Sequence, residues 1–514
     1  MSADWVSNYS SYGQLIDDPV SRCPDREAII YNGRRFTYAQ LDGLINKTAN
    51  YLLGSGVHKG SMVAIISRNC AEYIIAELAL YRIGAVAVKI NWRLTPCEMA
   101  YMLDLNEVTH AFYRPENDPW GEELTAKYRD RIQFIFMDAW ENEKSLVELV
   151  GDCSDAPVAV SVSREDVACH LHTSGTTGHP KCVVYTHGAM LNELQAASEV
   201  YPYPDGQKYQ FIAQMFHAAA IGAHLSLVTG GTMVLMQNFQ IDTYMQSLVN
   251  EKVNAISVVP TILKWILDEM DRNHYDLSSL NTVNYSTCPI PPVLLCRAMD
   301  KLHCSFYQSY GMTEMGSMVT VLGAQDHVTD DGKHLNSVGR PIRNAAVKIV
   351  GDDGNECPQG RSGEIYVKGP GMMKEYFKQP ELTAAAMSDG WYKTKDVGFI
   401  DEYGYLNLCG RADDLIISGG ENIYPGEVLN VIMRLCGDVA EAAVYGVPDE
   451  IWGEHVKASV VLMPESKLTA QELKDYCRKN MPSFRVPKEI EFLKELPKSA
   501  TGKVLVSELK KNRK

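Results

Sequence analysis

HTSGTTGHPK, residues His172–Lys181, is the stretch that decides the fold and the chemistry. Alternating residues before it predict a strand, and GAMLNELQAASEV after it predicts a helix, so its glycines are placed on a strand-to-helix loop. The free amides, four hydroxyls and Lys181 of such a loop suit a polyphosphate. The common loop G-x-x-x-x-G-K-[ST] differs, because His179 and Pro180 separate the second glycine from the lysine here. An ordinary Gly/Thr turn is the alternative for this stretch alone.

The size and charge of the chain narrow the classes of function. It has 514 residues, of which 46% are apolar, and this suffices for two or three domains with cores of their own. A net charge of −15 disfavours nucleic acid and anionic membranes as partners, and the basic residues at 510–514 are interpreted as a solvated end. An anionic ligand is therefore expected to be held by loop amides and a few placed cations.

The sequence also predicts a cytoplasmic protein. The N-terminal segment MSADWVSNYSSYG lacks the basic start and apolar run of an export signal. The most apolar region, Val63–Ile90, is interrupted by charged residues, so no membrane span is expected. Thirteen cysteines are scattered without a C-x-x-C pair, which indicates free thiols in a reducing compartment.

The order of the segments predicts an α/β fold with a small C-terminal domain. From about residue 28, β-branched runs such as SMVAIIS alternate with amphipathic segments, and capping boxes at Thr95 and Thr469 predict two helix starts. Between about residues 335 and 412, short strands and turns predict a β-rich subdomain. We expect a large domain over 1–412, with two α/β subdomains plus the β-rich one, and a small mobile α+β domain over 413–514.

Three further stretches extend the interpretation. They are YGMTEMG (310–316), GWYKTKDVGFIDEYGYLNLCGRADDLIISGGENIYPGEV (390–428) and PKSATGKV (497–504). Together with HTSGTTGHPK, and in this order, they resemble the acyl-adenylate-forming, or AMP-binding, superfamily of acyl-CoA ligases, luciferases and adenylation domains. The resemblance covers nearly the whole chain.

The resemblance implies a two-step reaction with ATP, Mg²⁺ and CoA. A carboxylate attacks the α-phosphorus of ATP and releases pyrophosphate, and a thiol then displaces AMP from the acyl-adenylate. A loop that only holds the departing β- and γ-phosphates does not need the lysine geometry of a kinase-type loop. This accounts for the unusual spacing of HTSGTTGHPK.

The resemblance also implies a nucleotide site. Its pyrophosphate loop would contain Thr173, Ser174, Gly175, Thr176, Thr177, Gly178 and Lys181, with Cys182 where relatives usually have glycine. Other nucleotide contacts would come from Gln308, Ser309, Tyr310, Gly311, Met312, Asp396 and Arg411. Tyr310 would lie against the adenine and Asp396 would bind the ribose. Thr313 would contact the α-phosphate and Glu314 would hold Mg²⁺; without the resemblance, Thr313 and Glu314 are interpreted as a helix cap and a first-turn acid.

The C-terminal region carries the remaining implied roles. Lys503 would bridge the incoming carboxylate and the α-phosphate, Asp413 would be the hinge of the small domain, and Gly419, Gly420 and Glu421 would face the pantetheine arm of CoA. Lys503 must withdraw before the thiol approaches, which implies rotation of the small domain. Taken alone, PKSATGK would be interpreted as a solvated basic segment.

The sequence indicates the class of the carboxylic acid substrate but not the particular acid. In the stretch Gln214–His217, amino-acid-activating relatives usually place an aspartate at the last position, and His217 there argues against an amino acid. The implied acyl pocket is lined by His217, Ala218, Gly222 and Gly316, with Ser286, Thr287 and Cys288 on the opposite wall beside the nucleotide. Side chains at 286 and 287, where many relatives have glycines, favour a short, branched or cyclic acid over a long straight chain.

Two other functions remain open from the sequence. One is a freestanding adenylation enzyme that loads its acid onto a carrier protein, and the other is a non-catalytic protein that binds ATP or an acyl-adenylate. The oligomeric state is also left open, with a homodimer among the options, since no coiled-coil seam is present.

Overall fold

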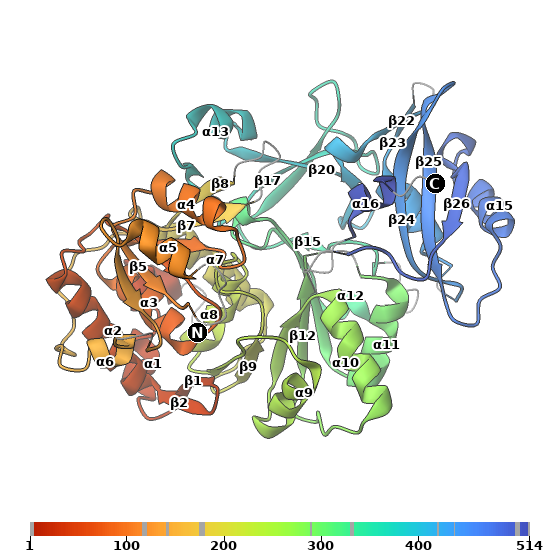
Figure 1. Cartoon of the computed structure of the whole chain (residues 1–514). Helices are drawn as coiled ribbons and strands as arrows, with labels where there is room; N and C mark the ends of the chain where they lie inside the picture. The colour runs from red at the N-terminus through yellow and green to blue at the C-terminus, as the bar shows by residue number, and fades with distance from the viewer. Residues whose placement is uncertain are drawn as a thin grey trace.

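The computed structural model describes residues 5–115, 121–139, 143–173, 180–287, 290–328, 334–418, 421–435, 437–498 and 504–511. Its large part contains two sheets flanked by helices, and a smaller C-terminal lobe, blue in Figure 1, lies to one side. This is the predicted class, a large α/β domain followed by a small α+β domain. No helix among the described residues combines the length and apolarity needed to cross a bilayer.

The first sheet holds the phosphate-loop strands. Within the described residues its order is β18-β8-β7-β4-β3-β5-β6, with β7–β8 and β8–β18 antiparallel and the other pairs parallel. The strands are β3 (Met62–Ile66), β4 (Val86–Ile90), β5 (His110–Tyr113), β6 (Gln133–Phe136), β7 (Val167–Thr173), β8 (Lys181–Thr186) and β18 (Glu375–Tyr376). Its helices are α2 (Tyr38–Gly54), α3 (Ala71–Arg82), α4 (Pro96–Leu105), α5 (Gly121–Tyr128) and α6 (Leu146–Leu149).

The second sheet has the order β15-β14-β13-β12-β11-β9-β10-β1-β2 among the described residues. Its strands are β1 (Glu27–Tyr31), β2 (Arg34–Thr37), β9 (Lys208–Phe211), β10 (Thr232–Leu235), β11 (Ala255–Val258), β12 (Thr282–Ser286), β13 (Ser305–Tyr310), β14 (Thr320–Leu322) and β15 (Arg340–Pro341). Figure 1 shows α9 (Ile241–Asn250), α10 (Pro260–Arg272) and α11 (Pro292–Leu302) on its outer side, beside the short α12 (Ala324–His327).

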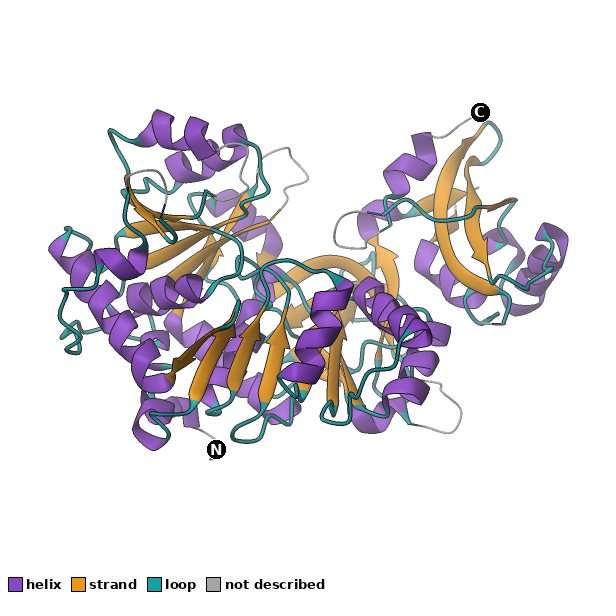
Figure 2. Cartoon of the chain, turned by 60° about the horizontal axis from the view of Figure 1, so that its bottom comes forward, coloured by secondary structure: helices purple, strands orange, loops and turns teal. Residues whose placement is uncertain are grey.

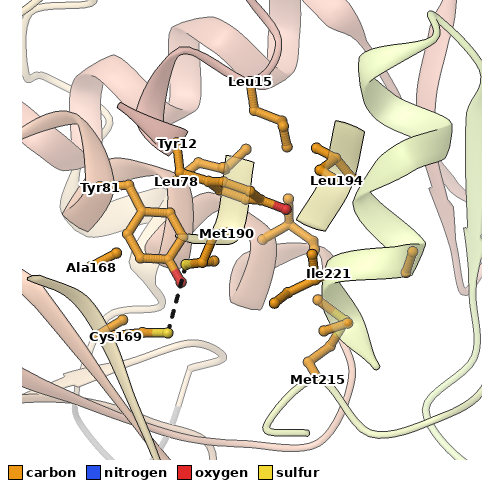
Figure 3. Close-up of a cluster of buried hydrophobic side chains, with 14 of the residues drawn as sticks. Tyr12, Leu15, Leu78, Tyr81, Ala168, Cys169, Met190, Leu194, Met215 and Ile221 are labelled. Atoms are coloured by element: carbon orange, nitrogen blue, oxygen red, sulfur yellow. Dashed lines mark hydrogen bonds between the residues drawn. The ribbon is translucent and has the colours of Figure 1, made fainter. Parts of the chain in front are cut away.

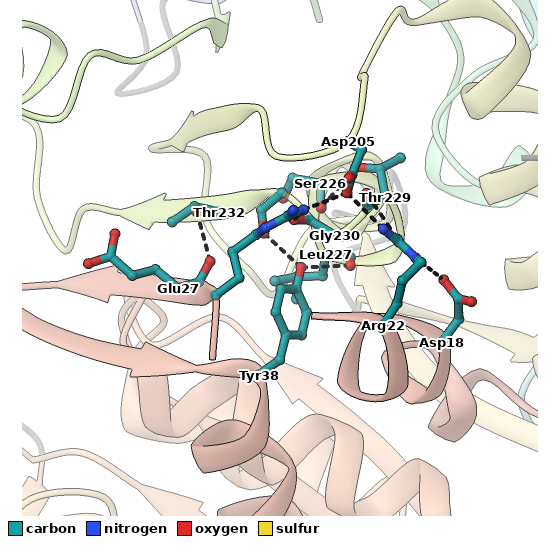
Figure 4. Close-up of polar contacts among 12 residues, drawn as sticks. Asp18, Arg22, Glu27, Tyr38, Asp205, Ser226, Leu227, Thr229, Gly230 and Thr232 are labelled. Carbon is teal, nitrogen blue, oxygen red and sulfur yellow. Dashed lines mark hydrogen bonds and ion pairs between the residues drawn. The ribbon is translucent and has the colours of Figure 1, made fainter. Parts of the chain in front are cut away.

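A single apolar core joins the inner faces of the two sheets. It includes α3 together with α7 (His187–Val200) and α8 (Ala220–Val228), and Figure 3 shows Tyr12, Tyr81, Met190 and Ile221 meeting within it. Polar contacts reinforce this junction at the surface end of α8, where Tyr38 Oη donates to the carbonyl oxygens of Leu227 (2.8 Å) and Gly231 (2.7 Å). Beside them Arg22, from α1 (Asp17–Arg22), pairs with Asp205 (Figure 4).

The β-rich part and the C-terminal lobe have sheets of their own. The first contains β16 (Ala346–Val350), β17 (Gly363–Lys368), β19 (Met387–Ser388), β20 (Trp391–Ile400) and β21 (Leu406–Arg411), with α13 (Pro380–Ala386) beside it. The lobe contains β22 (Ile416–Ser418), β23 (Glu421–Ile423), α14 (Pro425–Ile432), β24 (Val439–Asp449), β25 (Gly453–Leu462), α15 (Ala470–Asn480), β26 (Glu489–Phe492) and α16 (Val506–Lys511). Figure 2 shows the lobe set apart from the two large sheets.

Two local predictions from the sequence are confirmed and one is wrong. Thr95 and Thr469 form the predicted capping boxes of α4 and α15. The glycine loop, however, joins two strands rather than a strand and a helix, because residues 182–186 form β8 and pair with β7 before α7 begins at His187. The run CVVYT is β-branched and aromatic, which favours the strand. No helix N-terminus therefore directly follows the loop.

Candidate active site

The two ends of the phosphate loop lie side by side. Thr173 ends β7 and Lys181 begins β8, and these two residues are paired across the antiparallel ladder. The loop residues Ser174, Gly175, Thr176, Thr177 and Gly178 lie outside the described residues. The Lys181 ammonium lies 5.2 Å from the centre of the Tyr376 ring, on the neighbouring strand β18. Cys182 is buried directly behind Lys181.

Tyr376 connects Lys181 to Glu314. Glu314 lies on the short 3₁₀ turn Thr313–Met315 and is largely buried, and Tyr376 Oη donates a hydrogen bond of 2.7 Å to its Oε1. The Tyr376 hydroxyl also lies 3.1 Å from that of Tyr392. Burial and the Glu314 charge raise the Tyr376 pKa far above its ordinary value, so the phenol stays a donor. The sequence analysis missed Tyr376, since nothing around it in the chain marks it.

Glu314 is suited to a hard cation. A carboxylate has about four lone-pair sites, and the hydrogen bond from Tyr376 uses one of them. The described residues contain no group of three or more His, Cys, Asp or Glu side chains that could hold a metal ion alone. A Mg²⁺ ion at Glu314 would therefore take its other ligands from phosphate oxygens and water, as this ion usually does.

The ribose-binding candidate Asp396 is held by two partners. Tyr310 Oη donates to its Oδ2 (2.7 Å) and the Arg411 guanidinium lies 3.0 Å from its Oδ1. Asp396 and Arg411 face each other across β20 and β21, and Tyr310 ends β13. The structure thus brings together three of the predicted nucleotide residues from three strands.

The segment that carries Thr313 and Glu314 is fixed from below by Tyr185. Its hydroxyl donates to the Thr313 carbonyl oxygen and accepts from the Gly316 amide, at 2.7 Å from the nitrogen. Gly316 has φ +95°, and a Cβ there would lie 1.8 Å from Glu193 Oε2. Glycine at 316 is thus required by the close approach of Glu193, a buried residue of α7 that the sequence analysis also missed.

The Glu193 carboxyl is neutral at pH 7. Burial raises its pKa to about 8, and Ser317 Oγ donates to its Oε1 at 2.5 Å. The second oxygen has no hydrogen-bond partner among the described residues. A neutral carboxyl can be buried beneath the Gly316 turn, whereas an ionised one would be strongly disfavoured there.

The residues predicted to line the acid pocket come from α8, from the segment just before it and from the second sheet. Ala218 is buried, and a Cβ built on Gly222 would meet no atom within 4 Å, so space remains beside this helix. His217 is exposed to solvent, but the protein around it and the Arg93 guanidinium lower the pKa of its imidazole to about 4. The ring is therefore neutral at pH 7.

On the opposite wall, Ser286 ends β12 and Thr287 follows it with φ +76°. A β-branched residue in this conformation is strained by about 1–3 kcal/mol, and Cys288 lies outside the described residues. On β13, Gln308 is buried while Ser309 is half-buried. Gly311 and Met312 follow this strand, and a Cβ on Gly311 would overlap the Ser317 carbonyl oxygen.

The C-terminal candidates are only partly described. Glu421 begins β23 and is exposed, and Asp413 lies in the 3₁₀ turn Ala412–Asp414, whereas Gly419, Gly420 and Lys503 lie outside the described residues. The lobe contacts the β-rich part through α14, where Glu427 accepts from Ser362 Oγ at 3.1 Å. A Cβ on Gly426 would lie only 2.2 Å from the Cys409 carbonyl oxygen.

The large α/β domain thus brings Lys181, the buried Glu314 carboxylate and Asp396 to positions that the sequence predicts for phosphate, cation and ribose, as in a nucleotide-dependent enzyme. Family models assign it more narrowly: residues 16–377 match the AMP-binding enzyme model, and residues 430–503 match the AMP-binding enzyme C-terminal domain. The chain belongs to this family of acyl-adenylate-forming enzymes, and it is an AMP-forming acid:CoA ligase that uses ATP, Mg²⁺ and CoA.

Similar proteins act on different acids. A feruloyl-CoA synthase from Amycolatopsis sp is 34% identical over 96% of this chain and 98% of the relative. The long-chain-fatty-acid–CoA ligase FadD13 of Mycobacterium tuberculosis is 31% identical over 93% of both chains. The o-succinylbenzoate CoA synthetase MenE of Bacillus subtilis, solved with its acyl-adenylate intermediate, has a TM-score of 0.81, with 30% identity over 98% of this chain and 99% of that one.

Proposed function

We propose that the enzyme activates a compact, ring-containing carboxylic acid at the place where Lys181, Glu314 and Asp396 lie. The observation that carries this site is the position of Tyr376, which touches both Lys181 and Glu314. It links the loop for the departing phosphates to the carboxylate for the cation. Asp396, Tyr310 and Arg411 then mark the nucleoside end of the same site.

In the first step a carboxylate oxygen of the acid attacks the α-phosphorus of ATP and the bond to the β-phosphate oxygen breaks. Lys181 and the loop hold the β- and γ-phosphates, Thr313 and Lys503 contact the α-phosphate, and Asp396 orients the ribose. Glu314 would hold Mg²⁺, and this ion would neutralise charge on the pyrophosphate that leaves. A preorganised cation at the reacting phosphorus is worth about 3–4 kcal/mol.

In the second step the CoA thiol, after loss of its proton, attacks the acyl carbon. The bond to the AMP oxygen breaks, so AMP leaves with the electron pair and acyl-CoA forms. The small lobe carries both Lys503 and the Gly419–Glu421 segment, and rotation about Asp413 would exchange them at the site. Such an exchange lets one site perform two reactions with different requirements.

The wall beside α8 supports a compact acid. Alternating residues of β12 and β13 place Asn284, Ser286 and Ser309 on the sheet face toward this helix, and all three are polar. A tunnel for a long aliphatic chain would be expected to have an apolar lining. Among the relatives, this favours the aryl acids of feruloyl-CoA synthase, indoleacetate–CoA ligase and MenE over the long chain of FadD13.

The test is pyrophosphate release from purified protein with ATP, Mg²⁺ and a panel of aryl, branched and linear acids, with and without CoA. Multiple turnovers that require both one of the compact acids and CoA would support the proposal. A burst that stops after one turnover despite CoA would indicate a carrier-protein acceptor, as in the fatty acid–[acyl-carrier-protein] ligase ScoC of Streptomyces coeruleorubidus, which is 31% identical. ATP binding without any turnover would indicate a non-catalytic protein.

We also propose a cytoplasmic location. It is supported by the free cysteines, none of which is paired within the described residues, since unpaired thiols persist in a reducing compartment.

A further inference from the structure

A cavity of about 630 Å³ lies at the opposite end of the second sheet from the proposed active site. It is bounded by the first residues of β12 and β13, Thr282 and Ser305, and by Leu225 and Thr229 at the end of α8. Its rim includes exposed residues such as Glu199 and Ser305, so it opens to solvent. The two reaction steps use none of these residues.

The cavity and the acid wall lie on the same face of the sheet. Side chains two apart on a strand share a face, which places Thr282, Asn284 and Ser286 of β12 together. On β13 the same rule groups Ser305, Tyr307 and Ser309. The first member of each set borders the cavity and the last belongs to the acid wall. Four residues of strand separate the two ends, a distance of roughly 13 Å.

Helix α8, which covers this face, also has residues both near the acid wall and at the cavity. Gly222, Leu225 and Thr229 are three and four residues apart, so they lie on one side of α8 and its end. Gly222 borders open space near the acid wall, whereas Leu225 and Thr229 border the cavity. The acid-wall residues and the cavity-lining residues therefore share one face of the sheet and one side of α8, and they lie toward opposite ends of β12 and β13.

Tyrosine rings lie between the acid wall and the cavity. Tyr201 and Tyr203, which follow α7, both border the cavity and stack with ring centres 6.0 Å apart. The Tyr201 ring meets Tyr307 edge-on at 5.7 Å, and that of Tyr203 lies 5.3 Å from Tyr209.

Hydrogen bonds tie these tyrosines to the acid wall. Asn284 Nδ2 donates to Tyr203 Oη at 2.6 Å, a bond that is buried, and Tyr201 is hydrogen-bonded to Ser309. Asn284 and Ser309 are the wall residues next to the site. The rings are thus anchored at the boundary between the wall and the cavity.

We propose that Tyr201 and Tyr203 form the closed end of the acid-binding space and set the greatest length of acid that the enzyme accepts. This inference rests on the proposed function, because it takes the wall beside α8 as the acid site. An acid that reaches the rings stops there, and the cavity behind them becomes part of the acid site only when the rings are removed. The ligand class is therefore a short acid or one that ends in a ring, and long linear acids are excluded.

The test compares kcat/KM for cinnamate, indole-3-acetate, hexanoate, decanoate and hexadecanoate, measured by pyrophosphate release with CoA. Wild type should prefer its best compact acid over hexadecanoate by at least about tenfold, a ratio that corresponds to about 1.4 kcal/mol. Tyr201→Ala/Tyr203→Ala should raise the ratio of hexadecanoate to that compact acid at least tenfold. Adding Ser305→Trp, which fills the cavity from its rim, should reverse the gain.

Two controls separate ring removal from loss of stability. Tyr244→Ala deletes a buried tyrosine of α9 from the other core and should leave the ratio of acids unchanged. Tyr203→Leu shortens the side chain but keeps it apolar, and serves if the double alanine variant does not fold. The melting temperature of each variant reports its folding.

The outcomes distinguish a failure of the length limit from a failure of the proposed function. Wild type that uses hexadecanoate as well as any compact acid, or folded variants with an unchanged ratio, would overturn the length limit while leaving the ligase in place. Wild type that releases no pyrophosphate with any acid would overturn the proposed function, and the length limit with it.

Discussion

At the scale of single residues, Tyr376 positions the carboxylate that is proposed to hold Mg²⁺. Its neutral hydroxyl donates to Glu314 Oε1, and its ring lies under the Lys181 ammonium. One side chain therefore contacts both the Glu314 carboxylate, which is proposed to hold Mg²⁺, and the Lys181 ammonium, which is proposed to bind the departing phosphates. A hydrogen bond to a charged group is worth about 1.5–3 kcal/mol. Loss of the bond from Tyr376 should therefore slow pyrophosphate release only if Glu314 takes part in the reaction.

Tyr376→Phe should therefore lower the rate of pyrophosphate release about tenfold to a hundredfold, because the hydrogen bond to Glu314 is lost while the ring remains. AMP affinity should stay the same, since Tyr310, Asp396 and Arg411 are untouched. The measurement is single-turnover pyrophosphate release alongside calorimetry with AMP, with Tyr366→Phe on β17 as the control. An unchanged rate, or an equal loss of AMP affinity, would contradict the role of Tyr376.

Glu193 should make the protein less stable as the pH rises. Its pKa is about 8 in the folded protein against an ordinary 4.5, so the folded state binds more protons between these values. The stabilisation is complete below 4.5, declines as the pH rises and is lost by about pH 8, with a slope of up to about 1.4 kcal/mol per pH unit. Glu193→Gln should remove this slope.

Urea unfolding of both proteins from about pH 5 to pH 9 checks this linkage. The difference in unfolding free energy between Glu193→Gln and wild type should grow in favour of the variant up to about pH 8 and then level off. Parallel curves for the two proteins would show that Glu193 is ionised in the folded state.

At the scale of helices and strands, sequence signals that span a few residues predicted individual helices and strands but did not predict which strands pair. Capping boxes and apolar periodicity predicted α4, α15, β3 and the β11–α10 pair, because these signals lie within a few residues of each other. The glycine loop was assigned to a strand and a helix because β8 was not recognised as a strand. Tyr376 escaped prediction because β18 is only two residues long and acquires its place by pairing with β8, far away in the sequence.

The residues predicted to bind the nucleotide came from motifs that can be read in the sequence. Asp396 and Arg411 belong to such a motif, and the structure places both of them beside Tyr310, while their roles in binding stay predictions. The rings proposed to close the acid site follow α7 and pack against Tyr307 of β13 and Tyr209 of β9, and this packing follows from tertiary structure alone. The sequence indicated a compact acid from residues 286 and 287 without any sight of these tyrosines.

A buried ion cluster between elements gives a prediction at this scale. Glu77 of α3 forms an ion pair with Lys89 of β4, and its Oε2 lies 3.4 Å from His224 Nε2 of α8. All three side chains are almost fully buried. Burial acts to raise the Glu77 pKa, but the Lys89 ammonium and the neighbouring His224 outweigh it and lower this pKa to about 2. The cluster thus joins both subdomains at the shared core.

Glu77→Gln should destabilise the protein by about 3–5 kcal/mol, because it leaves the Lys89 charge buried without its partner. The folding free energy from urea unfolding is the measurement, and Glu77→Gln/Lys89→Met, which removes both charges, should recover part of the loss. A change below about 1 kcal/mol for the single variant would mean that water reaches Lys89.

At the scale of the whole molecule, the proposed two-step reaction has the C-terminal lobe take two positions. Lys503→Ala should slow acyl-adenylate formation about a thousandfold, because it removes the cation that is proposed to bridge the acid and the α-phosphate. Thioester formation from a supplied acyl-adenylate should be largely spared. Rapid-quench assays of the two half-reactions measure this, and an equal loss in both would contradict an alternating lobe.

The contact between α14 and β21 shows how to trap the lobe. Gly426 lies so close to the Cys409 carbonyl oxygen that a Cβ would be 2.2 Å away, so Gly426→Ala cannot keep the lobe in the position of the structure. The half-reaction that uses this position should slow at least about tenfold, while the other half-reaction should proceed. Gly437→Ala in the same lobe, where a Cβ meets no atom within 4 Å, is the matched control.

If Gly426→Ala and Lys503→Ala block opposite half-reactions, the structure shows the thioester-forming position; if they block the same one, it shows the adenylate-forming position. Equal loss of both half-reactions in Gly426→Ala, with none in Gly437→Ala, would mean that this contact persists through the whole cycle and that the lobe does not leave it.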